Sequence, residues 1–462
     1  MKRTRAAAAE SITEGVIWRQ LLLFFFPILL GTFFQQLYNT VDAMIVGKFV
    51  GKEALAAVGS ATSNLINLII GFFVGLSSGA TVIISQFYGG RRDEDVSKTV
   101  HTAAALALVG GAVLTVLGLA LSPTFLVWMG TPEAVMPYAV PYIRIYFLGM
   151  IPSMIYNIGS GVLRAVGDSR RPLYFLILAC MVNIVLDVVL VVGLEMGASG
   201  AAWATILSQA ASAVLVILTL RRTHASYQLH PREIRFHGAL LRRVVQIGLP
   251  AGLQSVMYSI SHVIIQTAIN GFGTNVLAGW TAYSKLDGLY WMTINAFGVA
   301  ITTFAGQNFG ARRYDRMKRS MWVCLGMSLV ATAALSALLL LGGKTLLGLF
   351  SDDGEVVASG LQILYFMVPG YVTYLCVEIL SGTVRGAGDS LIPTIMTLVG
   401  ICLLRVVWVA GICAGSRDLI QVLMCYPITW SATSLMFILY YWKAPWLKRC
   451  IRRAGLDAAS QA

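Results

Sequence analysis

The chain has 462 residues, of which 57% are hydrophobic and 12% charged, with a mean hydropathy of +0.75. Soluble domains carry about 25% charged residues, so this composition excludes an ordinary soluble protein and indicates a chain solvated by lipid. The formal net charge of +13 raises the question of a nucleic-acid partner. The basic residues cluster in short loops between apolar runs, however, which is typical of membrane proteins, and no nucleic-acid partner is expected.

Apolar runs of about 20 residues or more can cross a bilayer as helices. Such runs predict an all-α integral membrane protein with twelve transmembrane helices, at residues 16–47, 54–85, 97–122, 134–163, 172–194, 198–220, 243–270, 276–307, 318–342, 356–384, 392–413 and 418–442. The main basic clusters lie before the first span, after even-numbered spans, or in the tail, at residues 2–5, 91–98, 170–171, 221–243, 312–319 and 448–453. Both termini are therefore expected in the cytoplasm, and the protein in the cytoplasmic membrane of a bacterium or archaeon.

Two segments of the first half recur in the second half. The sequence QFYGGRR at 86–92 returns as QNFGARR at 307–313, and LRAVGDS at 163–169 returns as VRGAGDS at 384–390, each 221 residues later. Six spans per half is an even number, so both halves cross in the same sense and form a parallel repeat. This predicts two six-helix bundles around a central cleft: an N-terminal lobe (1–220), a solvated cytoplasmic linker (221–242), and a C-terminal lobe with a basic cytoplasmic tail (243–462).

The first span combines a proline with polar side chains. Pro27, like Pro250 in the seventh span, removes a backbone hydrogen bond and permits a bend, which is either a static kink or a bend that responds to Asp42. Asp42 lies about 8 Å inside the outer end of the span at 1.5 Å per residue. A carboxylate at the bilayer centre costs about 2.5–3.5 kcal/mol, so a functional role is favoured over a helix cap or a stray ion pair. Gln35, one heptad earlier, is a candidate for lining the substrate cavity.

The fifth and sixth spans carry polar groups at a similar depth. Asp187 and Thr205 each lie about 10 Å below the outer face, and Asn183 precedes Asp187 by one helical turn. Together with Asp42, these oxygen-bearing side chains predict a site for a proton or for Na⁺ in the outer leaflet. Asn157 in the fourth span is a second candidate for the substrate cavity, unless it bonds a neighbouring helix.

The second half lacks this set of residues. At the repeat offsets, Ile265 stands in place of Asp42 and Trp408 in place of Asp187. The ion chemistry is therefore expected in the N-terminal lobe alone.

The C-terminal half has charged residues of its own within predicted spans: Lys285, Asp287, Glu378 and Arg405. Opposite signs suggest internal ion pairs. The alternative is that Glu378, with Lys285 nearby, lines the cavity and contacts a cationic substrate.

These residues resemble those of the multidrug and toxic compound extrusion family, the MATE transporters, over essentially the whole chain. The matching features are Pro27 and Asp42, the segment 86–92, Leu163-Arg164 with Gly167-Asp168, and Asn183 with Asp187. The resemblance implies two six-helix bundles facing across a cleft, and export of organic cations and drugs in exchange for Na⁺ or H⁺. It also implies that Asp42, Asn183, Asp187 and Thr205 form the ion site. The seventh span has no acidic residue, so the chain looks like the DinF-type branch.

Three other classes of protein deserve comparison. A major facilitator transporter would carry an acidic-basic signature after the second span, which is missing. A lipid-linked oligosaccharide flippase would line its cavity with several basic residues, and only Lys285 and Arg405 are candidates here. A membrane-embedded prenyltransferase would need paired Asp-rich motifs, which do not occur.

The sequence therefore favours a secondary active antiporter that works by alternating access and is not an enzyme. It has no P-loop, so ATP is not the expected energy source, and no cofactor is expected beyond the coupling ion, H⁺ or Na⁺. The expected partners are a small organic cation or drug and membrane lipid, and the expected oligomeric state is a monomer.

Overall fold

The computed structural model describes residues 12–412 and 418–456, apart from the side chains of residues 60, 61, 63, 64 and 412. The basic residues at positions 2–5 and Arg417 lie outside this part. Regular structure in the described ranges is helical throughout, with no strand. This agrees with the composition, because a helix satisfies all its backbone hydrogen bonds internally, as a segment within lipid must.

The first half contains the helices α1 to α8, and the following linker leads to α9. Their bounds are α1 (Ile17–Phe49), α2 (Lys52–Ala56), α3 (Ser63–Gly89), α4 (Asp93–Trp128), α5 (Met136–Leu148), α6 (Met150–Ala165), α7 (Arg170–Asp187), α8 (Gly197–Arg222) and α9 (Gly238–Asn270). Short π-helical turns follow α2 and α7, namely η1 (Ala57–Ala61) and η2 (Val188–Gly193), and the linker holds a 3₁₀ turn, η3 (Pro231–Glu233).

The second half continues with α10 to α18. Their bounds are α10 (Thr274–Gly310), α11 (Tyr314–Gly348), α12 (Gly354–Met367), α13 (Tyr371–Gly386), α14 (Leu391–Thr397), α15 (Leu404–Val407), α16 (Leu419–Leu423), α17 (Cys425–Lys443) and α18 (Trp446–Arg453). A 3₁₀ turn, η4 (Val368–Gly370), joins α12 to α13, and two π-helical stretches flank α15, η5 (Leu398–Leu403) and η6 (Trp408–Ile412).

The long helical stretches match the twelve predicted spans. Nine stretches in the described residues are long and apolar enough to cross a membrane, and the bent pair α5–α6, with an angle of 51°, makes a tenth. The other two are α9 and α10, which are 33 and 37 residues long but carry more polar side chains. The prediction of an all-α membrane protein with twelve transmembrane helices is confirmed.

The packing of the helices divides the chain into two units whose borders lie inside helices. One unit is residues 26–252, and the other combines residues 1–25 with 253–462. The chain therefore changes unit within α1 just before Pro27 and within α9 just after Pro250. This division differs from the sequence repeat, because the first turns of α1 and α9 pack with the opposite copy rather than with their own.

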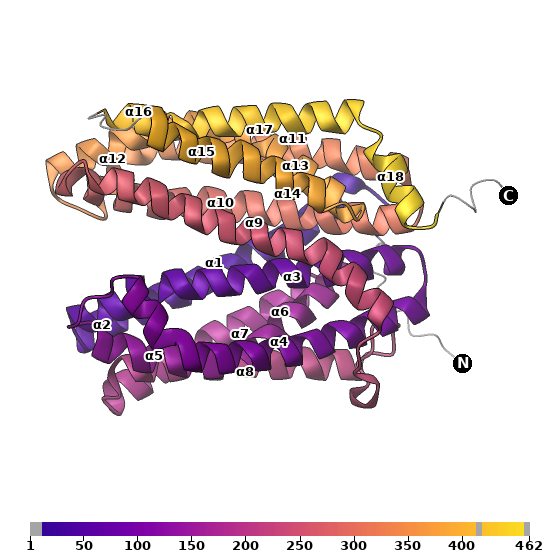
Figure 1. Cartoon of the computed structure of the whole chain (residues 1–462), viewed down its shortest axis with the longest axis horizontal. Helices are drawn as coiled ribbons and strands as arrows, with labels where there is room; N and C mark the ends of the chain where they lie inside the picture. The colour runs from indigo at the N-terminus through magenta and orange to yellow at the C-terminus, as the bar shows by residue number, and fades with distance from the viewer. Residues whose placement is uncertain (1–11, 413–417, 457–462) are drawn as a thin grey trace. The chain divides into compact units, whose positions relative to one another are not determined.

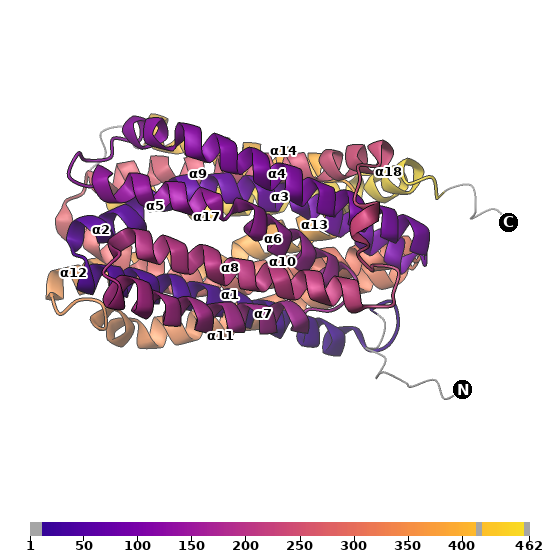
Figure 2. The same cartoon turned by 90° about the horizontal axis from the view of Figure 1, so that it is seen from below.

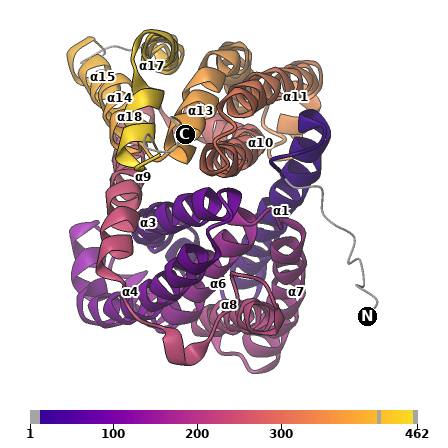
Figure 3. The ribbon, with the colours of Figure 1, turned by 90° about the vertical axis from the view of Figure 1, so that its right-hand side faces the viewer.

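Within each unit the helices run side by side (Figure 1). In the unit 26–252, α6 packs against α3, α4 and α8, and α7 lies along α8 (Figure 2). In the other unit, α13 packs between α10 and α17, as the end-on view shows, and α10 also contacts α11 and α12 (Figure 3). Each unit thus has a central helix, α6 or α13, and these two helices are repeat equivalents.

The duplicated motifs fold into the same turns. After α3, the amides of Gly90, Arg91 and Arg92 bond the carbonyls of Gln86, Tyr88 and Phe87, and the segment after α10 repeats this pattern 221 residues later. Arg91 and Arg312 both adopt a positive φ, 54° and 56°, in this turn. Gly167 and Gly388 likewise share φ values of 96° and 97°, a conformation that glycine adopts at little cost. The repeat read from the sequence is therefore also a repeat of backbone conformation.

The linker between α8 and α9 is only partly solvated. Leu229 is buried, and the amide of His230 donates to Nε2 of the buried His101 on α4, at 3.0 Å. The amide of His237 donates to the hydroxyl of Thr102, also on α4. Backbone groups of this stretch therefore find partners on α4, while most other linker residues are exposed or half-buried.

Candidate functional site

The four residues predicted to bind the ion are all buried in the unit 26–252. Asp42 lies on α1, Asn183 and Asp187 on α7, and Thr205 on α8; their exposed fractions are 5%, 0%, 0% and 4%. The carboxyl groups of Asp42 and Asp187 are close enough for their charges to interact. The structure therefore brings at least the two acids together, although they are 145 positions apart in the sequence.

Most polar atoms of this cluster lack hydrogen-bond partners. Oδ1 of Asp42, both carboxylate oxygens of Asp187, and both side-chain polar atoms of Asn183 are buried and form no hydrogen bond with any described group. Native proteins pair the large majority of buried polar atoms, because leaving one unpaired costs about 1–3 kcal/mol. Five such atoms on Asp42, Asn183 and Asp187 make these residues the candidate site of this unit.

The local backbone places Asp187 at a change of helix type. Asp187 is the last residue of α7, and the π-helical turn η2 begins directly after it. Turns of this kind occur often at functional sites, because the extra residue per turn redirects neighbouring groups. Asn183, one turn earlier, shares the face of Asp187.

The hydroxyl proton of Thr205 is used within its own helix. Its hydroxyl donates to the carbonyl of Ala201 at 3.0 Å, a bond within α8. The lone pairs of the hydroxyl oxygen remain available, and a hydroxyl oxygen is a suitable ligand for a hard cation.

Three tyrosines surround the two acids. Tyr142 interacts electrostatically with both Asp42 and Asp187, and Tyr38 and Tyr146 interact with Asp42. All three are buried, and the rings of Tyr142 and Tyr146 lie 6.3 Å apart at 28°. Sequence reasoning missed Tyr142 and Tyr146. Their spacing of four residues in the fourth span was the available signal, but it equally fits ordinary packing.

The two weaker candidates in this unit lie differently. Gln35 is exposed on α1, and Asn157 is half-buried on α6, where its amide donates to the carbonyl of Ser153 at 2.9 Å. Asn157 therefore bonds within its own helix. A buried polar atom that sequence reasoning did not single out is Oε1 of Gln209 on α8, which has no partner among the described groups.

The second copy holds apolar groups at the matching positions. Ile265 on α9 is buried, with 1% exposed. Trp408 is the first residue of η6, which matches the position of the π-helical turn after Asp187, and its indole donates to the carbonyl of Gln421 at 3.0 Å. Both copies thus have the π-helical turn, and the carboxylates occur only in the first.

The C-terminal unit contains a carboxylate held by aromatic donors. Oδ1 of Asp287 accepts hydrogen bonds from the hydroxyls of Tyr371 (2.6 Å) and Tyr283 (3.1 Å), and Oδ2 accepts from the indole of Trp291 (2.8 Å). The ring of Tyr371 stacks on that of Tyr290 at 4.0 Å. Both carboxylate oxygens of Asp287 therefore accept hydrogen bonds from aromatic side chains.

Glu378 lies next to this cluster and is bonded more weakly. Its Oε2 accepts from the hydroxyl of Tyr374 at 3.4 Å, and Tyr374 also bonds Tyr258 at 3.2 Å. Glu378 packs so tightly against Gly298 of α10 that a Cβ there would overlap its carboxylate. Tyrosine and tryptophan side chains therefore lie beside both acids, Asp287 and Glu378.

Neither Lys285 nor Arg405 neutralises these acids. Lys285 is exposed on α10, and Arg405 is buried with its guanidinium over the ring of Tyr426, 4.4 Å from the centroid. No ion pair joins Lys285 or Arg405 to a described carboxylate, so the expected internal ion pairs do not form here. Nor do the described residues contain a cluster of three or more His, Cys, Asp or Glu that could hold a metal.

Twelve long helices in two duplicated halves, with acids buried inside them, define a multi-pass membrane transport protein. A family model described as MatE matches residues 27–189 and again residues 250–409, one match in each half. The chain belongs to this family, as the sequence resemblance predicted.

Known relatives and solved structures agree with this assignment. The chain is 29% identical over 445 residues to "Probable multidrug resistance protein YoeA" of Bacillus subtilis (strain 168), covering 95% of this chain and 96% of that protein. It is 24% identical over 412 residues to "Probable multidrug resistance protein NorM" of Bacillus cereus (strain ATCC 10987 / NRS 248), covering 88% and 89%. The fold matches a crystal structure of MATE in the bent conformation with a TM-score of 0.87 at 22% identity, over 98% of both chains.

Proposed function

We propose that this transporter is a secondary active antiporter that exports organic, often cationic drugs or toxins in exchange for H⁺ or Na⁺ by alternating access. Its relatives are named multidrug resistance proteins, which supports drug-like substrates. The unpartnered buried oxygens of Asp42 and Asp187 are the observation that carries the coupling part of the proposal. In this scheme the N-terminal lobe binds the ion at Asp42, Asn183, Asp187 and Thr205.

In this proposal the ion and the substrate favour different states of the transporter, and this couples transport to the ion gradient. A bound proton or Na⁺ supplies the missing partner of the buried carboxylates and stabilises one state, and the substrate stabilises the other. An ion that crosses the full potential releases about 2.3 kcal/mol per 100 mV. At about 1.4 kcal/mol per decade, this energy sustains a ratio of about fiftyfold for an uncharged substrate. Export of a monovalent cation in 1:1 exchange moves no net charge, so the concentration gradient of H⁺ or Na⁺ drives it.

The substrate is proposed to be cationic because of the C-terminal unit. Asp287 and Glu378 lie among tyrosine and tryptophan rings, and carboxylates combined with aromatic faces favour organic cations. A lipid-linked oligosaccharide flippase would instead require basic groups for an anionic substrate, whereas Arg405 faces Tyr426 and Lys285 is exposed. We further propose that the protein lies in the cytoplasmic membrane with both termini in the cytoplasm, as the basic loops indicate.

The test is transport of a fluorescent organic cation in proteoliposomes with the Na⁺ gradient and the pH gradient imposed separately. The wild type should transport the dye with one gradient and not in the absence of both. Asp42→Asn and Asp187→Asn should each abolish gradient-driven transport. The matched control is Asp352→Asn, which makes the same change at an exposed loop residue and should transport normally. Normal transport by both site variants would refute the coupling role.

A further inference from the structure

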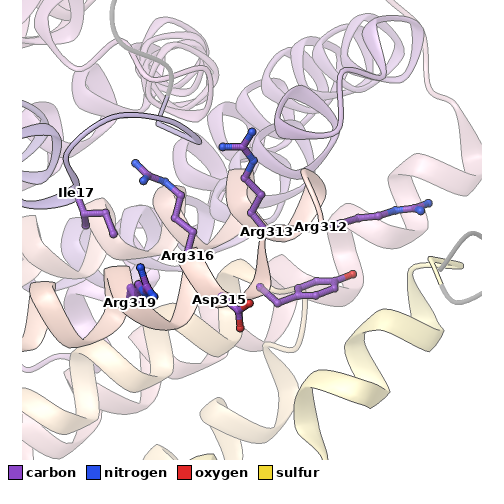
Figure 4. A pocket seen from close by; sticks show the side chains of 7 residues that line it. Ile17, Arg312, Arg313, Asp315, Arg316 and Arg319 are labelled. Carbon is purple, nitrogen blue, oxygen red and sulfur yellow. The ribbon is translucent and has the colours of Figure 1, made fainter.

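A basic cavity lies at the junction between the start of α1 and the turn from α10 to α11. It has a volume of about 460 Å³, and four arginines line it: Arg312, Arg313, Arg316 and Arg319 (Figure 4). Asp315 is the one acidic residue in the lining, and Ile17 supplies an apolar edge. The cavity is therefore strongly positive and lies at the ends of three long helices.

Two of the arginines hold the segment that precedes α1. Arg316 donates to the carbonyls of Ile12, Glu14 and Gly15, at 2.7–3.2 Å. Arg313 donates to the carbonyl of Thr13 at 2.6 Å and lies 3.4 Å from a carboxylate oxygen of Glu14. Carbonyls carry no net charge, so Glu14 and Asp315 are left to balance four guanidinium groups.

The other two arginines have no such role. Arg312 and Arg319 are exposed, and neither forms a hydrogen bond or ion pair with a described residue. The cavity thus retains a net positive charge, with Arg312 and Arg319 at opposite ends of its lining (Figure 4).

The duplicated first half provides an internal comparison. In segment 91–98 the bases Arg91, Arg92 and Lys98 face three acids, and the acids pair with them: Asp95 lies 2.7 Å from Arg92, and Glu94 2.5 Å from Lys98. In the second copy Arg316 replaces Asp95, and the segment 312–319 has five bases and one acid. The same turn therefore neutralises itself in one copy and carries an excess of positive charge in the other.

Neighbouring apolar side chains identify the kind of anion. Trp18 on α1 and Trp322 on α11 are exposed by 56% and 53%, and Trp322 lies one turn beyond Arg319 on the same helix. Exposed tryptophans mark the interfacial layer of a membrane. Further along α11 on the same face, Leu329 and Val330 are also exposed, so an apolar stripe leads away from the arginines.

We propose that this cavity binds the phosphate headgroup of an anionic phospholipid, with the acyl chains lying along the exposed stripe of α11. Guanidinium groups pair well with phosphate oxygens, and basic pockets between transmembrane helices bind anionic headgroups. A bound headgroup bridges α11 to the segment that Arg313 and Arg316 hold, so the lipid fixes the start of α1 within its unit. This role is independent of the ion site and of the transported substrate.

The experiment measures binding of phosphatidylglycerol to the purified full-length protein, by native mass spectrometry and by the shift in melting temperature. Phosphatidylcholine and inorganic phosphate are the comparison ligands. Phosphatidylglycerol should bind and stabilise the wild type, phosphatidylcholine much less, and millimolar phosphate should not displace the lipid. Equal effects of the two lipids, or displacement by inorganic phosphate, would overturn the proposal.

Matched variants locate the site. Arg312→Gln with Arg319→Gln should weaken phosphatidylglycerol binding by about tenfold to thirtyfold, from the loss of two basic groups near a membrane surface. The repeat equivalents, Arg91→Gln with Lys98→Gln, should leave binding within about twofold. Arg312→Lys with Arg319→Lys should retain most of the affinity, which guards against a folding defect. If both copies' variants lose binding equally, the effect is one of net charge and the site is disproved.

Discussion

Gly79 of α3 packs backbone to backbone against Gly248 of α9, so that a Cβ on Gly79 would lie 2.7 Å from the Gly248 amide nitrogen. Gly75 and Gly252 make the same kind of contact one turn away, at 2.5 Å from a Gly75 Cβ to the Gly252 Cα. Each helix thus carries a small-xxx-small pair, which lets membrane helices approach closely. The contact fixes the first half of α9 in the unit 26–252.

The matching contact in the other copy has large side chains instead. There, Phe25 of α1 stacks on Phe297 of α10, with ring centroids 4.1 Å apart and an interplanar angle of 20°. The two helices that change unit are therefore held by different means, glycine pairs for α9 and aromatic stacking for α1.

The glycine contact predicts a steric effect of a single methyl group. Gly248→Ala should lower the free energy of unfolding by about 1–3 kcal/mol, because its Cβ would meet backbone atoms of Leu76 that cannot move aside. Thermal unfolding in detergent measures the change. Gly326→Ala is the control, since a Cβ at that exposed helical position meets nothing within 4 Å, and it should leave the protein as stable or more so.

The proposed ion site predicts that removing one of its carboxylates increases the stability of the protein while it abolishes coupled transport. Asp187→Asn should raise the free energy of unfolding in Na⁺-free buffer at high pH by about 1–3 kcal/mol, because under those conditions it removes a buried charge without partners. The wild type should instead gain stability when the coupling ion is added, and the variant should not. Melting curves with and without Na⁺, and across pH, give the result. A variant less stable than the wild type under all conditions would contradict the idea of an incomplete site.

The aromatic cluster around Asp287 predicts a structural role for the Tyr371 hydroxyl. Tyr371→Phe removes the 2.6 Å hydrogen bond to a carboxylate and should destabilise the protein by about 1.5–3 kcal/mol. Tyr365→Phe, on an exposed side chain of α12, is the control and should change stability little. Thermal unfolding measures the stability of both variants, and an equal loss of stability in the two would contradict the prediction.

The linker predicts a dependence on pH through His237. Its pKa is lowered by removal from water and then by the positive charges of Arg235 on the linker and of Lys98 on α4. The hydroxyl of Thr102 already donates to the carbonyl of Lys98, so Nδ1 of His237 donates to Thr102 and Nε2 accepts from Arg235. This network requires neutral His237.

Docking of the linker on α4 should therefore be complete above the ordinary histidine pKa of about 6.5 and weaken as the pH falls through the lowered value. Hydrogen exchange of residues 228–238 at pH 5 and at pH 7.5 measures this, with lower protection factors expected at pH 5 after correction for the slower intrinsic exchange at acidic pH. His237→Gln should remove most of the pH dependence. His224→Gln, at an exposed linker position, should retain it, and an unchanged response in His237→Gln would rule out this residue as its source.

The local sequence was enough for much of the candidate site. Asp42, Asn183 and Asp187 stood out because charged and amide groups are rare in apolar spans, and all three are buried in one unit. Their role in ion binding remains a prediction. Tyr142 and Tyr146 could not be singled out from the sequence, because a tyrosine in a transmembrane span usually has a packing role. Only the structure shows which residues lie next to it.

The sequence by itself determined that this is a helical membrane protein built from a duplicated half, because lipid demands long apolar helices and the repeated turns keep their glycines. Tertiary structure alone decided that the chain passes from one unit to the other within α1 and α9 rather than in the linker, and that Asp287 is held by aromatic donors rather than by a basic partner. These features depend on which helices touch. Hydropathy and residue spacing indicate which face of a helix is apolar, but they do not indicate which neighbouring helix it packs against.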